Sequence, residues 1–210
     1  MTDEFHAQKK AFEDYQTTLA QLVYRLETAL QPDERVLQSP DQPIQCPLGE
    51  EPLELLGKAL KDYAKRLGIL DKKKIRLQSA VQAVQKMAAK TTAISIYRRS
   101  MQKVHREVIR HMRKFRAVVF PDYRDRWQQF KTAREKMDLA RHEINGAKTT
   151  LEIEKRAVHY KEAVESFDVT CTSYIKLLEE LPSYQKTHAK DLFCWFQSHS
   201  NYHKKMATIV

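Results

Sequence analysis

The sequence predicts an all-α protein, a long kinked three-helix antiparallel coiled coil. Residues that break helices are scarce, since the 210-residue chain has only 4 glycines and 7 prolines, and five of the prolines lie between Pro32 and Pro52. Apolar residues recur at alternating spacings of three and four over long stretches, which is typical of helices that pack side by side. These two observations together predict long helices joined by few connections.

The first helix is predicted over about residues 3–30. One narrow heptad edge carries its apolar residues, and such an edge suits a coiled-coil-like bundle better than a broad globular face. Pro32 is expected to end this helix, because proline lacks the backbone N–H of a helical residue. The residues on this edge are Phe5, Phe12, Tyr15, Leu19, Leu22, Leu26 and Ala29.

Residues 31–51 are predicted to form an irregular insertion, because their prolines and Gly49 oppose a regular helix. An insertion of this length is either a mobile surface loop or a segment that touches a membrane or a partner. Both interpretations stay open. A short helix is predicted to follow over residues 53–67, closed by Gly68.

The second helix is predicted over about residues 72–144. Pro121 lies inside its apolar pattern and is expected to kink it. At about 1.5 Å per residue this helix would be on the order of 100 Å long, so it must lie along an extended bundle. Its clearest apolar seam is formed by Met101, His105, Val108, Met112, Phe115 and Val119.

The third helix is predicted over about residues 150–208, after a turn at Asn145-Gly146. Its seam runs without interruption from Ile153 to Leu181, and Pro182 is expected to introduce a second kink. An aromatic cluster near its end is either core or a dimer interface. That cluster consists of Leu192, Phe193, Trp195 and Phe196.

The stretch Tyr97–Arg141 is strongly basic. It holds 14 Lys or Arg and 5 Asp or Glu, a net charge of 14 − 5 = +9, whereas the whole chain carries +10. This concentration predicts an anionic partner, which is nucleic acid or an acidic membrane surface.

Motifs of catalysis are missing from the sequence. It contains no glycine-rich phosphate loop, no nucleophile elbow and no zinc-protease helix motif. His105 and Cys171 both fall on apolar seams, which predicts a core histidine and a small core residue. We therefore predict no enzyme activity, no cofactor and no metal site. The 3 cysteines are odd in number and widely spaced, which favours a reducing compartment.

Several stretches resemble BAR domains of the endophilin and amphiphysin type. DEFHAQKKAFEDYQTTLAQLVYRLETALQPDERV and ELLGKALKDYAKRLG resemble the start of an endophilin-type domain, and FPDYRDRWQQFKTAREKMDLARHEI resembles the middle of the second helix. LLEELPSY and SNYHKKM resemble the end of the third helix. The resemblance covers essentially the whole chain. It implies a single domain over residues 1–210 that pairs as a crescent-shaped homodimer and binds anionic membranes through a basic concave face, sensing or inducing curvature.

The resemblance also implies a set of lipid-binding residues. Lys131 and Lys136 match basic positions of the family's second helix, and the remaining arginines of that helix lie in the same neighbourhood. Three further residues flank the turn between the second and third helices. The full set is Arg124, Arg126, Lys131, Arg134, Lys136, Arg141, Lys148, Lys155 and Arg156.

Two departures from the endophilin pattern are visible. The chain starts directly in its first helix, so the amphipathic N-terminal helix typical of endophilins is either missing or lies outside this sequence, and the expectation of strong membrane insertion is weakened. The turn between helices two and three carries few lysines, so the charge must come mainly from the second helix.

Other partners remain as alternatives. A helical scaffold could use the same basic face to bind an acidic protein, such as a small GTPase. Nucleic acid is disfavoured, because the chain has no recognisable DNA- or RNA-reading motif. The expected location is the cytoplasm, with peripheral association to membranes in trafficking such as endocytosis.

Overall fold

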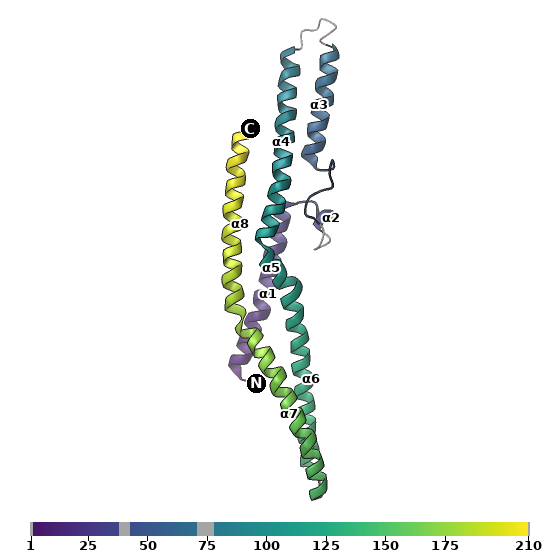
Figure 1. Ribbon diagram of the computed structural model, residues 1–210, viewed down its shortest axis with the longest axis vertical. Helices are drawn as coiled ribbons and strands as arrows, with labels where there is room; N and C mark the ends of the chain where they lie inside the picture. Colours follow the sequence, from purple (N-terminus) through teal and green to yellow (C-terminus); the bar gives the residue numbers. More distant parts are fainter. Residues whose placement is uncertain (1, 38–42, 71–77, 210) are drawn as a thin grey trace. The chain divides into compact units, whose positions relative to one another are not determined.

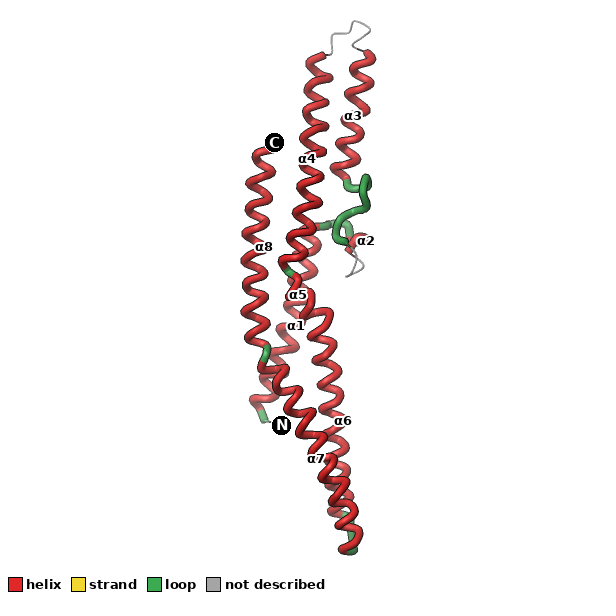
Figure 2. The backbone as a smooth tube through the Cα atoms, viewed as in Figure 1, coloured by secondary structure: helices red, strands yellow, loops and turns green. Residues whose placement is uncertain are grey.

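The computed structural model describes residues 2–37, 43–70 and 78–209. Every regular element within these ranges is helical and none is a strand, which confirms the all-α fold class (Figures 1 and 2). No helix among them is long and apolar enough to cross a bilayer. The elements in chain order are α1 (Asp3–Leu30), α2 (Glu34–Leu37), α3 (Pro52–Leu70), α4 (Gln78–Val108), α5 (Arg110–Lys114), η2 (Phe115–Val119), α6 (Phe120–Asn145), α7 (Thr150–Glu179) and α8 (Leu181–Ile209).

Two features of the insertion and the short helix differ from the sequence expectation. The insertion contains a helical turn, α2, and α3 does not stop at Gly68 but continues to Leu70. Gly68 is not in the left-handed conformation that a glycine cap adopts, since Gly49 is the glycine with positive φ, at 84°. The expected start of the second helix near residue 72 lies outside the described residues.

The helical ladder changes just before Pro121. Residues Phe115–Val119 form a π-helical segment, and the N–H of Phe120 donates to the carbonyl of Phe115. Pro121 stands in the first turn of α6, where the missing N–H of proline is tolerated. The sequence indicated an interruption at this proline but not the wider helical turn that precedes it.

The chain divides into two compact units. Unit 1 comprises Met1–Gln21 with His111–Ala189, and unit 2 comprises Leu22–Arg110 with Lys190–Val210. Unit 1 contains the α6–α7 hairpin and unit 2 contains the α3–α4 hairpin.

Aromatic rings fill the core of unit 1. The ring of Phe12 stacks on Tyr123 at a centroid distance of 4.6 Å and lies 5.5 Å from the ring of Phe115. All three side chains are fully buried. The Tyr123 hydroxyl donates to Glu13 at 2.9 Å, so the one polar atom of this stack has a partner.

The start of α7 is set by a reciprocal cap. The Thr149 hydroxyl accepts the N–H of Glu152 at 3.3 Å, and the Glu152 carboxylate accepts the N–H of Lys148 at 3.1 Å. This is a capping box, which satisfies backbone donors that the helix leaves free. Those backbone hydrogen bonds hold the pKa of Glu152 below its usual value.

Unit 2 packs α3 closely against α4. A Cβ on Gly57 would stand 3.0 Å from the Thr92 hydroxyl, so glycine permits the close approach of the two helices. A buried polar side chain also links two helices of this unit, since the Gln102 amide on α4 donates to the carbonyl of Leu30 on α1 at 2.9 Å.

Candidate functional site: a basic surface

One edge of α6 is basic. Successive helical residues are rotated by about 100°, so Arg124, Lys131, Arg134 and Arg141 fall within about 100° of one another on the same side of the buried seam. Lys136 falls on the other side of that seam by the same geometry. The seam itself is formed by Tyr123, Phe130, Ala133 and Ala140, all of which are buried.

Aromatic rings support this basic edge. The guanidinium of Arg124 lies 5.7 Å from the ring of Phe120, and the ammonium of Lys131 lies 5.9 Å from the ring of Trp127. The ammonium of Lys9, on α1, lies 4.8 Å from the same Trp127 ring. Cations at these distances over an indole are attracted by its π face. α1 therefore adds Lys9 beside the edge, where Glu13 pairs with its ammonium at 2.7 Å and offsets its charge.

Lys9 and Trp127 were not among the residues expected from the sequence. Trp127 is four residues before Lys131, so a helical spacing could have suggested that pair. No local signal could have brought Lys9 to the same ring, because its position depends on how α1 packs on α6.

Two of the expected lipid-binding residues make contacts inside the α6–α7 hairpin. Arg126 pairs with Asp122 at 2.9 Å and donates to the hydroxyl of Ser173 on α7, also at 2.9 Å. Arg156 on α7 donates to the carbonyl of Glu143 on α6 at 2.6 Å. Both guanidinium groups join the two helices, and Arg126 uses several of its donors in doing so.

The remaining expected residues are on the surface. Arg141 and Arg134 both approach Asp138, at 2.9 Å and 3.7 Å. The side chains of Lys136, Lys148 and Lys155 are exposed, and no carboxylate of the described chain lies within 4 Å of their ammonium groups. They retain their full charge for an external partner.

The first third of the basic stretch is largely neutralised from within unit 2. Arg98 approaches Glu51 at 3.6 Å, and Arg99 pairs with Glu54 at 2.5 Å. Arg106 approaches Glu27 at 3.5 Å. The glutamates lie outside Tyr97–Arg141, so the +9 counted along the sequence overstates the charge that this stretch offers to a partner.

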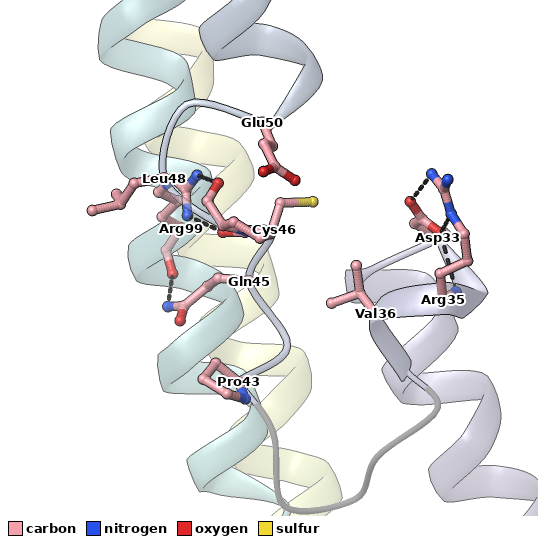
Figure 3. A pocket seen from close by; sticks show the side chains of 10 residues that line it. Asp33, Arg35, Val36, Pro43, Gln45, Cys46, Leu48, Glu50 and Arg99 are labelled. Carbon is pink, nitrogen blue, oxygen red and sulfur yellow. Dashed lines mark hydrogen bonds and ion pairs between the residues drawn. The ribbon is translucent and has the colours of Figure 1, made fainter.

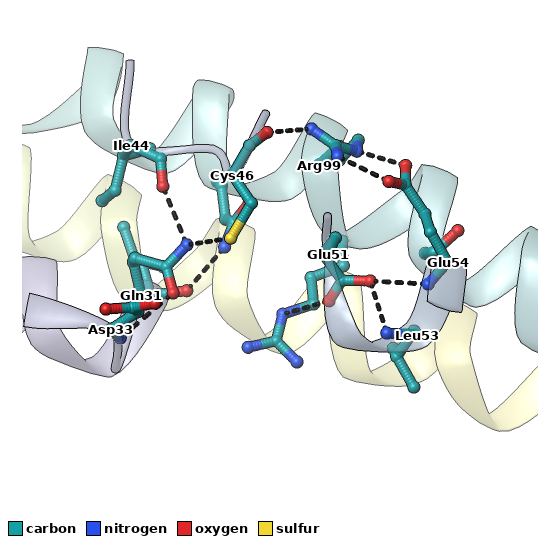
Figure 4. Close-up of polar contacts among 12 residues, drawn as sticks. Gln31, Asp33, Ile44, Cys46, Glu51, Leu53, Glu54 and Arg99 are labelled. Atoms are coloured by element: carbon teal, nitrogen blue, oxygen red, sulfur yellow. Dashed lines mark hydrogen bonds and ion pairs between the residues drawn. The ribbon is translucent and has the colours of Figure 1, made fainter. Parts of the chain in front are cut away.

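Arg99 is the most connected of these arginines (Figure 4). Besides Glu54 it donates to the carbonyl of Cys46 at 2.6 Å and to that of Pro47 at 2.8 Å. The hydrogen bond from Arg99 is the main cause that holds the pKa of Glu54 below its usual value, and burial opposes it. Arg99 therefore ties the end of the insertion to α4.

The family of the chain follows from a comparison over its whole length. The family model of the BAR domain matches residues 1–210. The chain belongs to the BAR domain family. A comparison with curated proteins gave no match. BAR domains are non-enzymatic scaffolding modules that generally dimerise and associate with membranes, sensing or binding their curvature.

An open pocket of about 790 Å³ lies beside the insertion of this BAR domain (Figure 3). Both of its arginines already have carboxylate partners: Arg35 pairs with Asp33 at 2.7 Å and Arg99 pairs with Glu54. The Cys46 thiol at its wall accepts from the amide of Gln31 at 3.3 Å. The pocket thus presents little uncompensated charge.

The described residues also contain no group of three or more His, Cys, Asp or Glu side chains placed to hold a metal ion.

Replacing Arg99 with Met is expected to release the insertion. The change removes four donor contacts and leaves the Glu54 carboxylate without its cation. The free-energy cost is larger than that of losing an exposed ion pair. Thermolysin cleavage near Leu48 should become about tenfold faster, which corresponds to about 1.4 kcal/mol of local opening. Arg35→Met is the matched control, because its pair with Asp33 is exposed. Equal cleavage of the two variants would contradict the anchoring role of Arg99.

A row of histidines lies between α4 and α8 in unit 2. His105 is buried with its ring edge-on to Trp195 at 5.4 Å, and its Nδ1 lies 2.9 Å from the carbonyl of Met101. His199 stacks on Trp195, and its Nε2 lies 3.0 Å from that of His203. Burial lowers the pKa of His105 first, and the neighbouring His199 lowers it further. Burial and His203 likewise lower the pKa of His199.

Acid is therefore expected to destabilise unit 2. A histidine whose pKa is lowered by folding binds its proton more weakly in the folded state, so stability falls as the pH drops below the unfolded value of about 6.5. His105→Leu should lose part of the fall in unfolding free energy between about pH 7.5 and about pH 5.5. His142→Gln, at an exposed site on α6, should retain it. Urea titrations at both pH values measure this, and an unchanged pH dependence in His105→Leu would exclude the assignment.

The charge of this BAR domain is not shared evenly between its units. Unit 1 has 17 Lys or Arg and 16 Asp or Glu, a net of 17 − 16 = +1. Unit 2 has 20 and 11, a net of 20 − 11 = +9. The sequence analysis therefore overlooked a second basic stretch. Residues 58–90 hold 10 Lys or Arg and 2 Asp or Glu, a net of 10 − 2 = +8.

Proposed function

We propose that this BAR domain binds anionic phospholipid membranes as a homodimer and senses or induces their curvature, as a peripheral protein of the cytoplasmic face in trafficking such as endocytosis. The proposal of lipid binding rests on the basic edge of α6. Its cations lie on aromatic rings at the surface, and the two rings that support them keep the charges in place without neutralising them.

Lipid contact is assigned to those expected residues whose charge faces outward. Arg124, Lys131 and Lys136 belong to this group on α6, and Lys148 and Lys155 belong to it near the turn. Arg134 and Arg141 contribute what remains after sharing Asp138. Arg126 and Arg156 hold the hairpin together, so we expect their replacement to change stability more than lipid affinity.

The attraction is electrostatic and additive over residues. Each basic side chain near an anionic membrane contributes about 1 kcal/mol, and the field falls off within a Debye length of about 8 Å at physiological salt. Binding should therefore need anionic lipid and should weaken as salt is raised.

Exposed apolar residues of unit 2 support the homodimer. The side chains of Leu56 and Tyr63 on α3 and of Met87 on α4 are about half exposed, and Phe193 and Phe196 on α8 are more so. Large apolar side chains exposed on several helices of one unit are candidates for a protein–protein contact. A second copy of the chain is the partner that the family provides, and a C₂ pair would bury the same surface from both sides.

The experiment that tests lipid binding uses neutralised variants in vesicle co-sedimentation. Arg124→Gln, Lys131→Gln and Arg134→Gln combined should lower affinity for vesicles containing phosphatidylserine by about tenfold or more, from about 1 kcal/mol per residue. The matched control replaces three exposed lysines of the same unit, Lys161, Lys176 and Lys186, with Gln. The two triple variants lose equal charge, so equal losses of affinity would contradict a role for the α6 edge.

A further inference from the structure

We propose that the α3–α4 hairpin carries a second contact for anionic phospholipid headgroups, the basic edge of α3 formed by Lys58, Lys61 and Lys65. This inference rests on the proposed membrane function and adds a contact in the unit that carries most of the net charge. The expected lipid-binding residues all belong to unit 1, whose net charge is only +1, whereas unit 2 carries +9. A surface that attracts anionic lipid by charge needs a contribution from unit 2.

The carboxylates that could neutralise this edge are already engaged. Glu54 lies four residues before Lys58, the spacing of a helical ion pair, yet both of its oxygens accept from Arg99 or from the backbone N–H of Gly49. Because Arg99 binds Glu54, Lys58 has no ion pair with the glutamate four residues before it.

Glu51 is also withdrawn from the edge. It is buried, one oxygen lies 3.6 Å from Arg98, and the other accepts the N–H groups of Leu53 and Glu54 at the start of α3. Among the described residues of α3, the acid beside the edge is Asp62, 3.4 Å from Lys65. In the described part of α4, residues 78–106 contain no acidic residue at all.

The basic edge and the apolar edge of α3 lie on opposite sides of its buried seam. Gly57 and Ala64 are buried against α4. At about 100° per residue, Lys58, Lys61 and Lys65 fall on one side of these two positions, and Leu56 and Tyr63 fall on the other. The hairpin can therefore present its apolar edge to a second copy and its lysines to a membrane at the same time.

The test compares two triple variants of the full chain that lose equal charge within unit 2. One replaces Lys58, Lys61 and Lys65 with Gln, and the other replaces the exposed Lys86, Lys190 and Lys204 with Gln. Affinity for vesicles of phosphatidylcholine with and without phosphatidylserine is measured at low and physiological salt. The α3 variant should bind anionic vesicles about tenfold or more weakly than wild type and should show a shallower salt dependence.

The outcomes separate this inference from the proposed function. If wild type binds anionic vesicles and the α3 variant binds as well as the unit 2 control, the hairpin contact is excluded and the α6 edge remains. If wild type binds neither kind of vesicle, the proposed function itself fails. Circular dichroism and sedimentation of both variants should match wild type, since all the replaced lysines are exposed. A folded, dimeric α3 variant with weakened binding supports the contact.

Discussion

Replacing Leu56 and Met87 together with Lys is expected to convert the homodimer to a monomer and to abolish most vesicle binding. The two side chains lie on α3 and α4 and are 48% and 57% exposed, so the folded monomer accommodates the change. In the dimer, the new ammonium groups would be buried without partners, which costs several kcal/mol per charge. At about 1.4 kcal/mol per tenfold, dimer affinity should fall by more than about 100-fold.

Lysine is chosen because it disrupts the dimer while adding positive charge. The effect of assembly on vesicle binding can then be separated from the effect of net charge. The double variant raises the net charge of the chain from +10 to +12, so any loss of affinity for anionic vesicles must come from loss of the dimer. Leu151→Lys, at a 65% exposed position in unit 1, is the control that gains charge without touching the apolar surface. Sedimentation velocity measures the assembly, and an intact dimer in the double variant would refute the interface assigned here.

Replacing Phe12 with Ala is expected to cost about 3–5 kcal/mol of unfolding free energy in unit 1. The ring is fully buried and stacks on Tyr123, and loss of that stacking adds to the cavity that the smaller side chain leaves. Such a loss is a large share of the total stability of a domain. The effect should be far larger than that of Leu151→Ala at an exposed site.

Urea unfolding followed by circular dichroism gives the size of the Phe12 effect, and hydrogen exchange gives its location. Protection should fall in α6 and α7 before it falls in α3 and α4, because the stack belongs to unit 1. A loss below about 1 kcal/mol, as for an ordinary surface change, would show that the Phe12 site collapses around the smaller side chain and that the stack contributes little.

The sequence was sufficient for the helical class because that class depends on local signals. Scarce glycine and proline, together with apolar residues at heptad spacing, predicted long packed helices without knowledge of the tertiary fold. His105 was likewise assigned to the core from its position on a seam, and it is buried. Gly68 shows the limit of such signals, since α3 continues to Leu70 past a residue that often ends a helix.

The basic residues that keep their charge for a partner were harder to predict from the sequence. Counting charge along Tyr97–Arg141 could not show that Arg98 and Arg99 take up Glu51 and Glu54, which approach only through the packing of α3 on α4. The same long-range pairs are the reason that Lys58 has no acidic partner. Charge along a chain predicts the kind of partner, whereas the tertiary fold decides which charges remain for it.

Co-sedimentation of the wild-type chain with vesicles tests whether this BAR domain binds anionic membranes. Vesicles of phosphatidylcholine alone and with phosphatidylserine, each in a small and a large diameter, are compared at low and physiological salt. The proposal predicts binding to the anionic vesicles alone, weakening with salt, and a preference for one diameter. Equal binding to neutral vesicles, or no binding to any vesicle, would contradict it.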